Sequence, residues 1–215
     1  MKKRLATTLL ATMIATSAQA YQAGDFVVRA GAAGVYPTGD GSITPVPGGS
    51  VEADSAWSLG ISLTYMATNN IGVGVLGAWP FTHDIDGKGA LAGADIGETK
   101  HLPPTVTLQY HFDNGSKLHP YVGAGINYTA FFDTKEGSAL SGAKLDLDNS
   151  WGLAGELGVD YEMQNDWLVG AQVFYIDIDT DAKVSGTGAP PAGIDGTYNV
   201  SIDPWVFMVS VGKKF

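Results

Sequence analysis

The side chains that could do chemistry are few in this 215-residue chain. With no cysteine, the chain has no disulfide framework, thiolate metal site or cysteine nucleophile. His83 and His101 flank a polar stretch and could begin a metal site or act as a pH switch. No third ligand is evident beside them, and no Ser/His/Asp arrangement can be picked out. We therefore expect no catalytic residue, no metal and no cofactor.

Charge and hydropathy narrow the class of protein. Lys and Arg number 12 against 22 Asp and Glu, which gives a net charge of −10 and excludes the basic surface that nucleic acid requires. The mean hydropathy of +0.06 argues against a helical membrane protein. It does not argue against a membrane β-barrel, because only every second residue of a barrel strand faces lipid.

The first 20 residues have the pattern of a secretory signal peptide. Lys2, Lys3 and Arg4 precede an apolar run, and Ala18-Gln19-Ala20 is a small-x-small cleavage site. The run is too short to span a membrane as a helix. We expect two segments: a signal peptide over residues 1–20 and a β-barrel over residues 21–215.

Alternation of apolar and small polar residues predicts strands in the mature chain. From Trp57 to Tyr65 every second residue is apolar, a period of two. Similar stretches bring the number of expected strands to eight: residues 26–36, 57–65, 71–81, 105–112, 121–132, 151–161, 167–178 and 205–215. Three short turns and four long polar connections join them alternately, which is the layout of an outer-membrane barrel.

A soluble lipocalin-type barrel or β-sandwich would alternate in the same way. Two features favour the membrane barrel. The second face is mostly small and carries few charges, whereas a soluble barrel would expose a charged face. Aromatic residues gather near strand ends, as membrane interfaces require, and the terminal Phe215 resembles the signal read by the barrel insertion machinery.

Several segments resemble the OmpW/AlkL/OprG family of outer-membrane proteins. They include PFTH at 80–83, KHLPPT at 100–105, TYMATNNIGV at 64–73, PYVGAGINYT at 120–129 and DPWV at 203–206. The resemblance implies an all-β, eight-stranded antiparallel transmembrane β-barrel in the bacterial outer membrane, with short periplasmic turns and long extracellular loops. It also implies a narrow apolar channel through which small hydrophobic molecules enter from outside and pass sideways into the membrane.

Three prolines suggest where such a sideways exit lies. If the second long hairpin is symmetric about Leu91 and Ala92, Pro80 faces Pro103 and Pro104, and His83 faces His101. Proline lacks a backbone donor, so facing prolines would leave a gap in the wall. We expect a lateral opening there; a bulge that only bends the wall is the alternative.

Charged residues at alternating positions that should face the lumen suggest that the periplasmic end of the barrel is closed. Arg29, Glu156, Asp160 and Lys214 could form a polar plug across the lumen, which an apolar solute would cross only at high cost. They could also simply satisfy one another and fill space. The outer half is expected to be an apolar channel lining of Met66, Leu76, Phe81, Leu102, Phe131, Phe174 and Met208.

Two alternatives to transport remain open. The chain could be a structural or interaction barrel whose loops bind lipopolysaccharide or surface partners, or an enzyme with a catalytic cluster at the rim. Asp177, Asp179 and Asp181 resemble the start of a calcium loop, but Ala182 replaces its glycine. We expect these carboxylates to face water or to share divalent cations with lipopolysaccharide. The expected partners are small hydrophobic solutes, outer-membrane lipid and lipopolysaccharide, and the insertion machinery.

Overall fold

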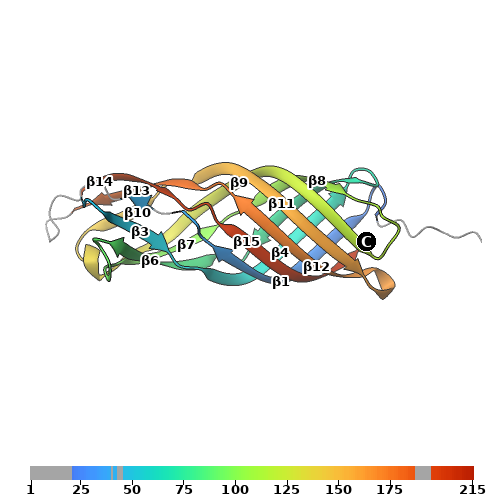
Figure 1. The fold of residues 1–215 in the computed structure, drawn as a ribbon, viewed down its shortest axis with the longest axis horizontal. Coiled ribbons are helices and arrows are strands. Elements are labelled where there is room, and N and C mark those ends of the chain that lie inside the picture. Colours follow the sequence, from blue (N-terminus) through green and yellow to red (C-terminus); the bar gives the residue numbers. More distant parts are fainter. Residues whose placement is uncertain (1–20, 40, 43–45, 187–194) are drawn as a thin grey trace, which may run out of the picture.

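The computed structural model describes residues 21–39, 41–42, 46–186 and 195–215. The expected signal peptide lies outside the described residues. Eight long antiparallel strands close into a barrel (Figure 1). They are β1 (Phe26–Tyr36), β4 (Ala56–Met66), β5 (Ile71–Ala78), β8 (Thr105–His111), β9 (Leu118–Glu136), β11 (Ser150–Glu162), β12 (Trp167–Ile176) and β15 (Trp205–Lys214).

Each barrel strand pairs with its neighbours in the order of the chain, and the ring closes where the first strand meets the last. β1 pairs with β15, the last strand, and β9 pairs with β11. The resulting order β1-β4-β5-β8-β9-β11-β12-β15 has no free edge within the barrel wall. The expected eight-stranded antiparallel barrel is confirmed.

The wall follows the period of two that the sequence shows. On β4, the exposed Leu59, Ile61 and Leu63 alternate with Gly60, Ser62 and Thr64, which point into the barrel. Large apolar side chains cover the outside because lipid solvates them, and small residues fill the narrow lumen. Gly125 and Gly31 lie where a neighbouring strand passes so closely that a Cβ atom would overlap a backbone carbonyl oxygen.

The strands extend beyond the barrel at the end opposite the C-terminus (Figure 1). β6 (Phe81–Gly89) continues β5, β7 (Asp95–Leu102) leads into β8, and β3 (Gly49–Ala53) pairs with both β6 and β2 (Gly41–Ser42). A separate three-stranded sheet combines β10 (Lys144–Leu147), β13 (Asp179–Ser185) and β14 (Gly196–Ser201). The long connections were expected to be polar loops; much of their length is strand.

Two 3-10 turns, η1 (Ser138–Leu140) and η2 (Gln164–Asp166), complete the described elements. In the described part of the chain, no helix is long and apolar enough to cross a membrane.

Close strand approach at Gly125 makes a testable prediction. Gly125→Ala places a methyl group against the Val106 carbonyl oxygen, and overpacking of this kind costs about 1–3 kcal/mol. We expect a lower urea midpoint for unfolding of the micelle-embedded barrel. Gly155→Ala is the control, because a Cβ there meets no heavy atom within 4 Å. Equal midpoints for the two variants would contradict the prediction.

Candidate functional site

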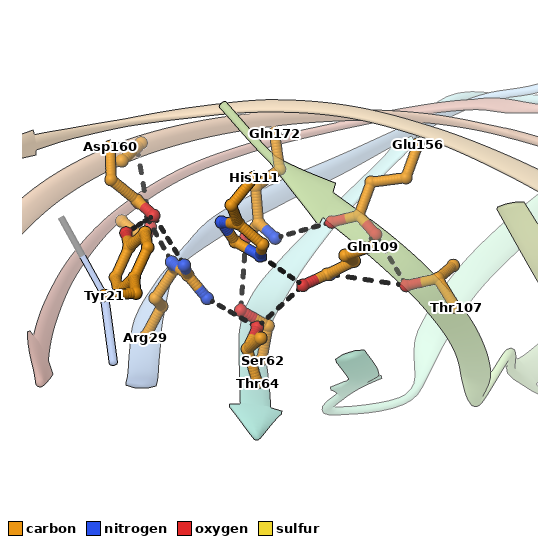
Figure 2. Close-up of polar contacts among 12 residues, drawn as sticks. Tyr21, Arg29, Ser62, Thr64, Thr107, Gln109, His111, Glu156, Asp160 and Gln172 are labelled. Carbon is orange, nitrogen blue, oxygen red and sulfur yellow. Dashed lines mark hydrogen bonds and ion pairs between the residues drawn. The ribbon is translucent and has the colours of Figure 1, made fainter. Parts of the chain in front are cut away.

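A buried ion pair lies at the short-turn end of the lumen (Figure 2). Arg29 on β1 holds Asp160 on β11 through two hydrogen bonds, Nη2 to Oδ2 at 2.5 Å and Nε to Oδ1 at 2.9 Å. Both side chains are fully buried. The Tyr21 hydroxyl donates to Asp160 Oδ2 at 2.7 Å. The pair is therefore well satisfied by hydrogen bonds, as a buried ion pair must be to persist.

A second buried carboxylate extends this layer across the lumen. Glu156 accepts hydrogen bonds from Thr107 Oγ1 at 2.6 Å, Gln109 Nε2 at 2.8 Å and Gln172 Nε2 at 3.2 Å. Thr64 connects the two carboxylate sites, since it accepts from Arg29 Nη1 at 3.0 Å and donates to Gln109 Oε1 at 3.1 Å. We call these residues, together with Tyr21, Arg29 and Asp160, the base network (Figure 2).

Aromatic rings pack around the base network. Tyr21 meets His111 edge-on at a centroid distance of 4.9 Å, His111 stacks on Tyr121 at 4.6 Å, and the Arg29 guanidinium lies 5.4 Å from the Tyr121 ring centroid. The charged groups of the base network are therefore hydrogen-bonded and packed among aromatic rings, as buried polar groups must be to avoid a desolvation penalty.

The structure brings three of the four expected plug residues into this layer. Lys214 lies elsewhere: it is partly exposed and forms ion pairs with Glu162 at 3.5 Å and Asp166 at 3.8 Å. Its position on β15, close to the end of the strand, puts its long side chain within reach of the rim. The alternation on β4 and β8 places Thr64 and Gln109 on the inward face, so the sequence could have identified them as members of this layer. No sequence signal pointed to Tyr21.

The middle of the lumen is apolar. Leu76, Phe81, Phe174 and Met208 belong to one buried cluster, which also contains Val35, Ala56, Ile176, Ile178 and Val206, and Phe131 packs against it. These expected lining residues therefore lie between the base network and the outer end.

Two expected lining residues do not lie there. Met66 ends β4 at the short-turn end and packs with Tyr21, Val27 and Leu168 below the apolar middle. Leu102 lies on the opposite face of β7 from the buried Thr99 and His101 and is half-buried. Inward parity switches from Leu76 on β5 to Phe81 on β6, which turns Phe81 toward the lumen. From Thr99 to His111 the buried residues are odd-numbered without interruption, so the even-numbered Leu102 faces away from the lumen.

The long hairpins enclose a cavity of about 460 Å³. Its wall is almost entirely apolar and is built mainly on the cluster of Val51, Ile96, Leu140, Leu145, Ala182 and Val184. Phe131 contributes to the wall and also packs on the apolar middle. We call this space the outer cavity. The sequence did not predict it because its wall comes from segments interpreted as polar connections.

The proline residues border an interruption in the wall. Pairing of β5 with β8 stops at Leu76 opposite Thr105, and pairing of β6 with β7 resumes at Phe81 opposite His101. Residues 77–80 on one side and 102–104 on the other lie between the two ladders. Each side of the interruption instead bonds to the strand on its other side. Trp79 N–H donates to the Leu59 carbonyl oxygen on β4 at 2.8 Å, and the Pro104 carbonyl oxygen accepts from Tyr128 N–H on β9 at 3.0 Å. We call this interruption the wall gap.

The expected hairpin symmetry is wrong. Gly87 N–H donates to the Ala94 carbonyl, which centres the turn on Ala90 and Leu91 rather than on Leu91 and Ala92. A register shift between Ile85 and Asp86 partly offsets this displacement of the turn centre. His83 therefore pairs with Thr99, and His101 pairs with Phe81. Their imidazole rings nevertheless stack, with centroids 4.7 Å apart.

Within the described ranges, no group of three or more His, Cys, Asp or Glu residues could hold a metal ion.

A closed antiparallel barrel with an apolar outside, a small-residue lumen and long hairpins at one end defines an outer-membrane β-barrel protein. Residues 22–215 match the OmpW family, and the chain belongs to it. The OmpW family is one of outer-membrane barrels rather than of enzymes, and the protein resides in the bacterial outer membrane. The short-turn end is accordingly periplasmic and the long hairpins are extracellular.

Individual relatives agree with this assignment. Outer membrane protein W of Escherichia coli is 46% identical over 100% of this chain and 99% of its own length. The crystal structure of OprG from Pseudomonas aeruginosa superposes with a TM-score of 0.83 at 40% identity, covering 92% of this chain and 98% of that one. The dibenzothiophene metabolism operon protein DoxH of Pseudomonas sp. is 28% identical over 79% of this chain and 77% of its own.

The Arg29–Asp160 pair should show strong coupling. Arg29→Met alone leaves a buried carboxylate without its cation, and Asp160→Leu alone leaves a buried guanidinium, so each should lower the free energy of unfolding by about 3–5 kcal/mol. The double variant should lose much less than the sum. Urea unfolding of all four proteins in one detergent measures the cycle. Additive losses would show that the two side chains do not act as a pair.

Proposed function

We propose that this protein is a passive channel for small hydrophobic molecules, which enter the outer cavity from outside and leave through the wall gap into the outer membrane. The observation that carries the proposal is the order of three features along one barrel: an apolar cavity, an interrupted wall below it and a polar layer further down.

The outer cavity suits an apolar solute. Its volume of about 460 Å³ falls in the range of small-molecule sites, and its lining offers few polar groups. Below it, the apolar middle continues toward Leu76 and Phe81, the last and first paired residues on either side of the wall gap. A hydrophobic molecule that moves down from the cavity thus stays among apolar side chains until it reaches the gap.

The wall gap offers a way out because its backbone groups are not used in pairing across it. Pro80, Pro103 and Pro104 lack the N–H donors that would extend the ladder. Residues 77–80 outnumber residues 102–104 by one, so the gap also has the form of a bulge. The transport experiment below separates a functional opening from a bulge that only bends the wall.

The base network favours sideways exit over passage along the axis. Moving an apolar solute past Arg29, Asp160 and Glu156 would break buried, charge-assisted hydrogen bonds. The name of the DoxH relative supports the solute class, because it refers to the metabolism of dibenzothiophene, an apolar aromatic compound.

A second candidate is a structural or interaction barrel that binds lipopolysaccharide or surface partners. The observation that favours it is the charged outer surface, where Lys183 pairs with Asp148 and Lys135 pairs with Glu98. Such a protein would bind its partners without transporting a solute.

Restoring backbone donors should reseal the wall gap. Pro103→Ala/Pro104→Ala adds two N–H groups that can bond to carbonyls of residues 77–80. We expect uptake of an apolar tracer such as dibenzothiophene into cells producing the protein to fall several-fold. Pro120→Ala, a wall proline on β9 away from the gap, should leave uptake unchanged. Unchanged uptake in a correctly inserted double variant would refute lateral exit at this place.

Filling the outer cavity should also block uptake. Ala182→Trp places a large ring among the lining residues, so we expect both binding and uptake of the same tracer to fall. Ala171→Trp adds the same ring on the exposed, lipid-facing side of β12 and is the matched control. If the two variants take up the tracer at the same rate, the outer cavity is not on the route.

A further inference from the structure

Two buried histidines lie between the outer cavity and the wall gap. His83 on β6 and His101 on β7 are only 3% and 4% exposed, and their rings stack at 4.7 Å with an interplanar angle of 16°. Phe81 stacks on His101 at 5.4 Å. The Phe81–His101 pair is the first one beyond the gap, and Thr99, the partner of His83, lines the cavity. A solute that follows the proposed route passes these rings.

Each of these imidazoles has a buried nitrogen without a partner. Nε2 of His83 and Nε2 of His101 have no hydrogen-bond partner among the described residues. Most buried polar atoms in proteins are hydrogen-bonded, so two orphaned atoms side by side on an otherwise apolar route require an explanation.

The tautomer of His83 decides which partner its free nitrogen can take. Its Nδ1 contacts the backbone carbonyl oxygen of Asp54, which can only accept a hydrogen bond. Nδ1 must therefore carry the proton, and in the neutral ring Nε2 is then an acceptor. The missing partner of His83 is a hydrogen-bond donor.

The rings are neutral at ordinary pH. Outward-facing neighbours on the same strands include Asp84 and Lys100, so this part of the wall lies above the hydrocarbon layer. Burial lowers the pKa of His101 to about 3 and also lowers the pKa of His83 from its usual value. Two uncharged rings can stack as observed, and the Nε2 lone pair of His83 remains available.

We infer that the His83–His101 pair is a polar subsite that accepts a hydrogen bond from the hydroxyl group of an otherwise apolar solute. The inference rests on the proposed channel and narrows its substrate class to hydrophobic molecules that carry a hydroxyl, such as phenols and long-chain alcohols. The hydrocarbon part would occupy the apolar surroundings of Phe81 and Phe131, and the hydroxyl would supply the donor that His83 lacks.

The test uses two probes of nearly equal shape, 4-methylphenol and 1,4-dimethylbenzene, with the full barrel in lipid nanodiscs. One hydrogen bond to a buried acceptor should make the phenol bind about 3- to 10-fold more tightly than its lipid partitioning alone accounts for. His83→Phe/His101→Phe should abolish that preference while 1,4-dimethylbenzene still binds. Thr82→Val, on the outward face of β6, is the control and should keep the preference.

A second measurement does not depend on the variants folding. The ¹⁵N resonance of His83 Nε2 in the native protein should shift when 4-methylphenol is added and remain in place with 1,4-dimethylbenzene. No shift and no preference, with both probes bound, would overturn the subsite but leave the channel standing. A shift and a preference without any uptake of either probe would support the subsite and overturn the channel. Failure of both probes to bind would overturn both.

Discussion

The requirement that every backbone N–H and C=O in the membrane finds a partner governs this structure. An unpaired group in hydrocarbon costs several kcal/mol, so an antiparallel sheet must close on itself before it can span the bilayer. Here the ladder closes through the pairing of β1, the first strand, with β15, the last. The interruption between β5 and β8 departs from that requirement, because backbone groups there are not paired across the wall. It is tolerated because each side of it bonds to its other neighbour, β4 or β9, and because proline removes donors that would otherwise be unsatisfied.

The narrow lumen that this closure creates is divided into layers of different chemistry. The base network uses residues from β1, β4, β8, β11 and β12, so it ties together strands that are not neighbours in the wall. Above it the interior is apolar, and the outer cavity continues that character between the extracellular hairpins. In the proposed channel, this polar layer beneath an apolar chamber disfavours passage along the barrel axis and favours exit through the wall gap.

Much of the fold could be predicted from the sequence because a barrel strand reveals its two faces by alternation. The span of β1 was predicted without error, and β4 and β12 nearly so. The register between strands was harder to predict from the sequence, because it depends on where a turn is centred and on the positions of bulges. A displaced turn centre and a register shift between Ile85 and Asp86 pair His83 with Thr99 rather than with His101, although the two imidazole rings stack. Leu102 has the even parity of the outward-facing Val106 and Leu108 and therefore faces away from the lumen. The outer cavity could not be predicted from the sequence, because its apolar lining residues are scattered among polar residues in the long connections.

The candidate site was predictable only in part for a related reason. Arg29, Glu156 and Asp160 could be recognised as inward-facing charges, but which side chains meet across a lumen depends on strand tilt and stagger. Thr64, Gln109 and Tyr21 were therefore missed as partners. Lys214 has the right parity and the right end of the barrel, yet its ion pairs are with Glu162 and Asp166 at the rim.

In the proposed channel, an apolar solute leaves the outer cavity through the wall. The most direct test of this exit is to locate a fluorinated alkane bound to the lipid-embedded protein by ¹⁹F solid-state NMR. We predict contacts of the alkane with Leu140 in the cavity, with the buried Pro103 beside the gap and with lipid chains. Contacts with Thr64 and Gln109 in the base network, without contacts at Pro103, would show that the solute moves along the barrel axis instead and would contradict lateral exit.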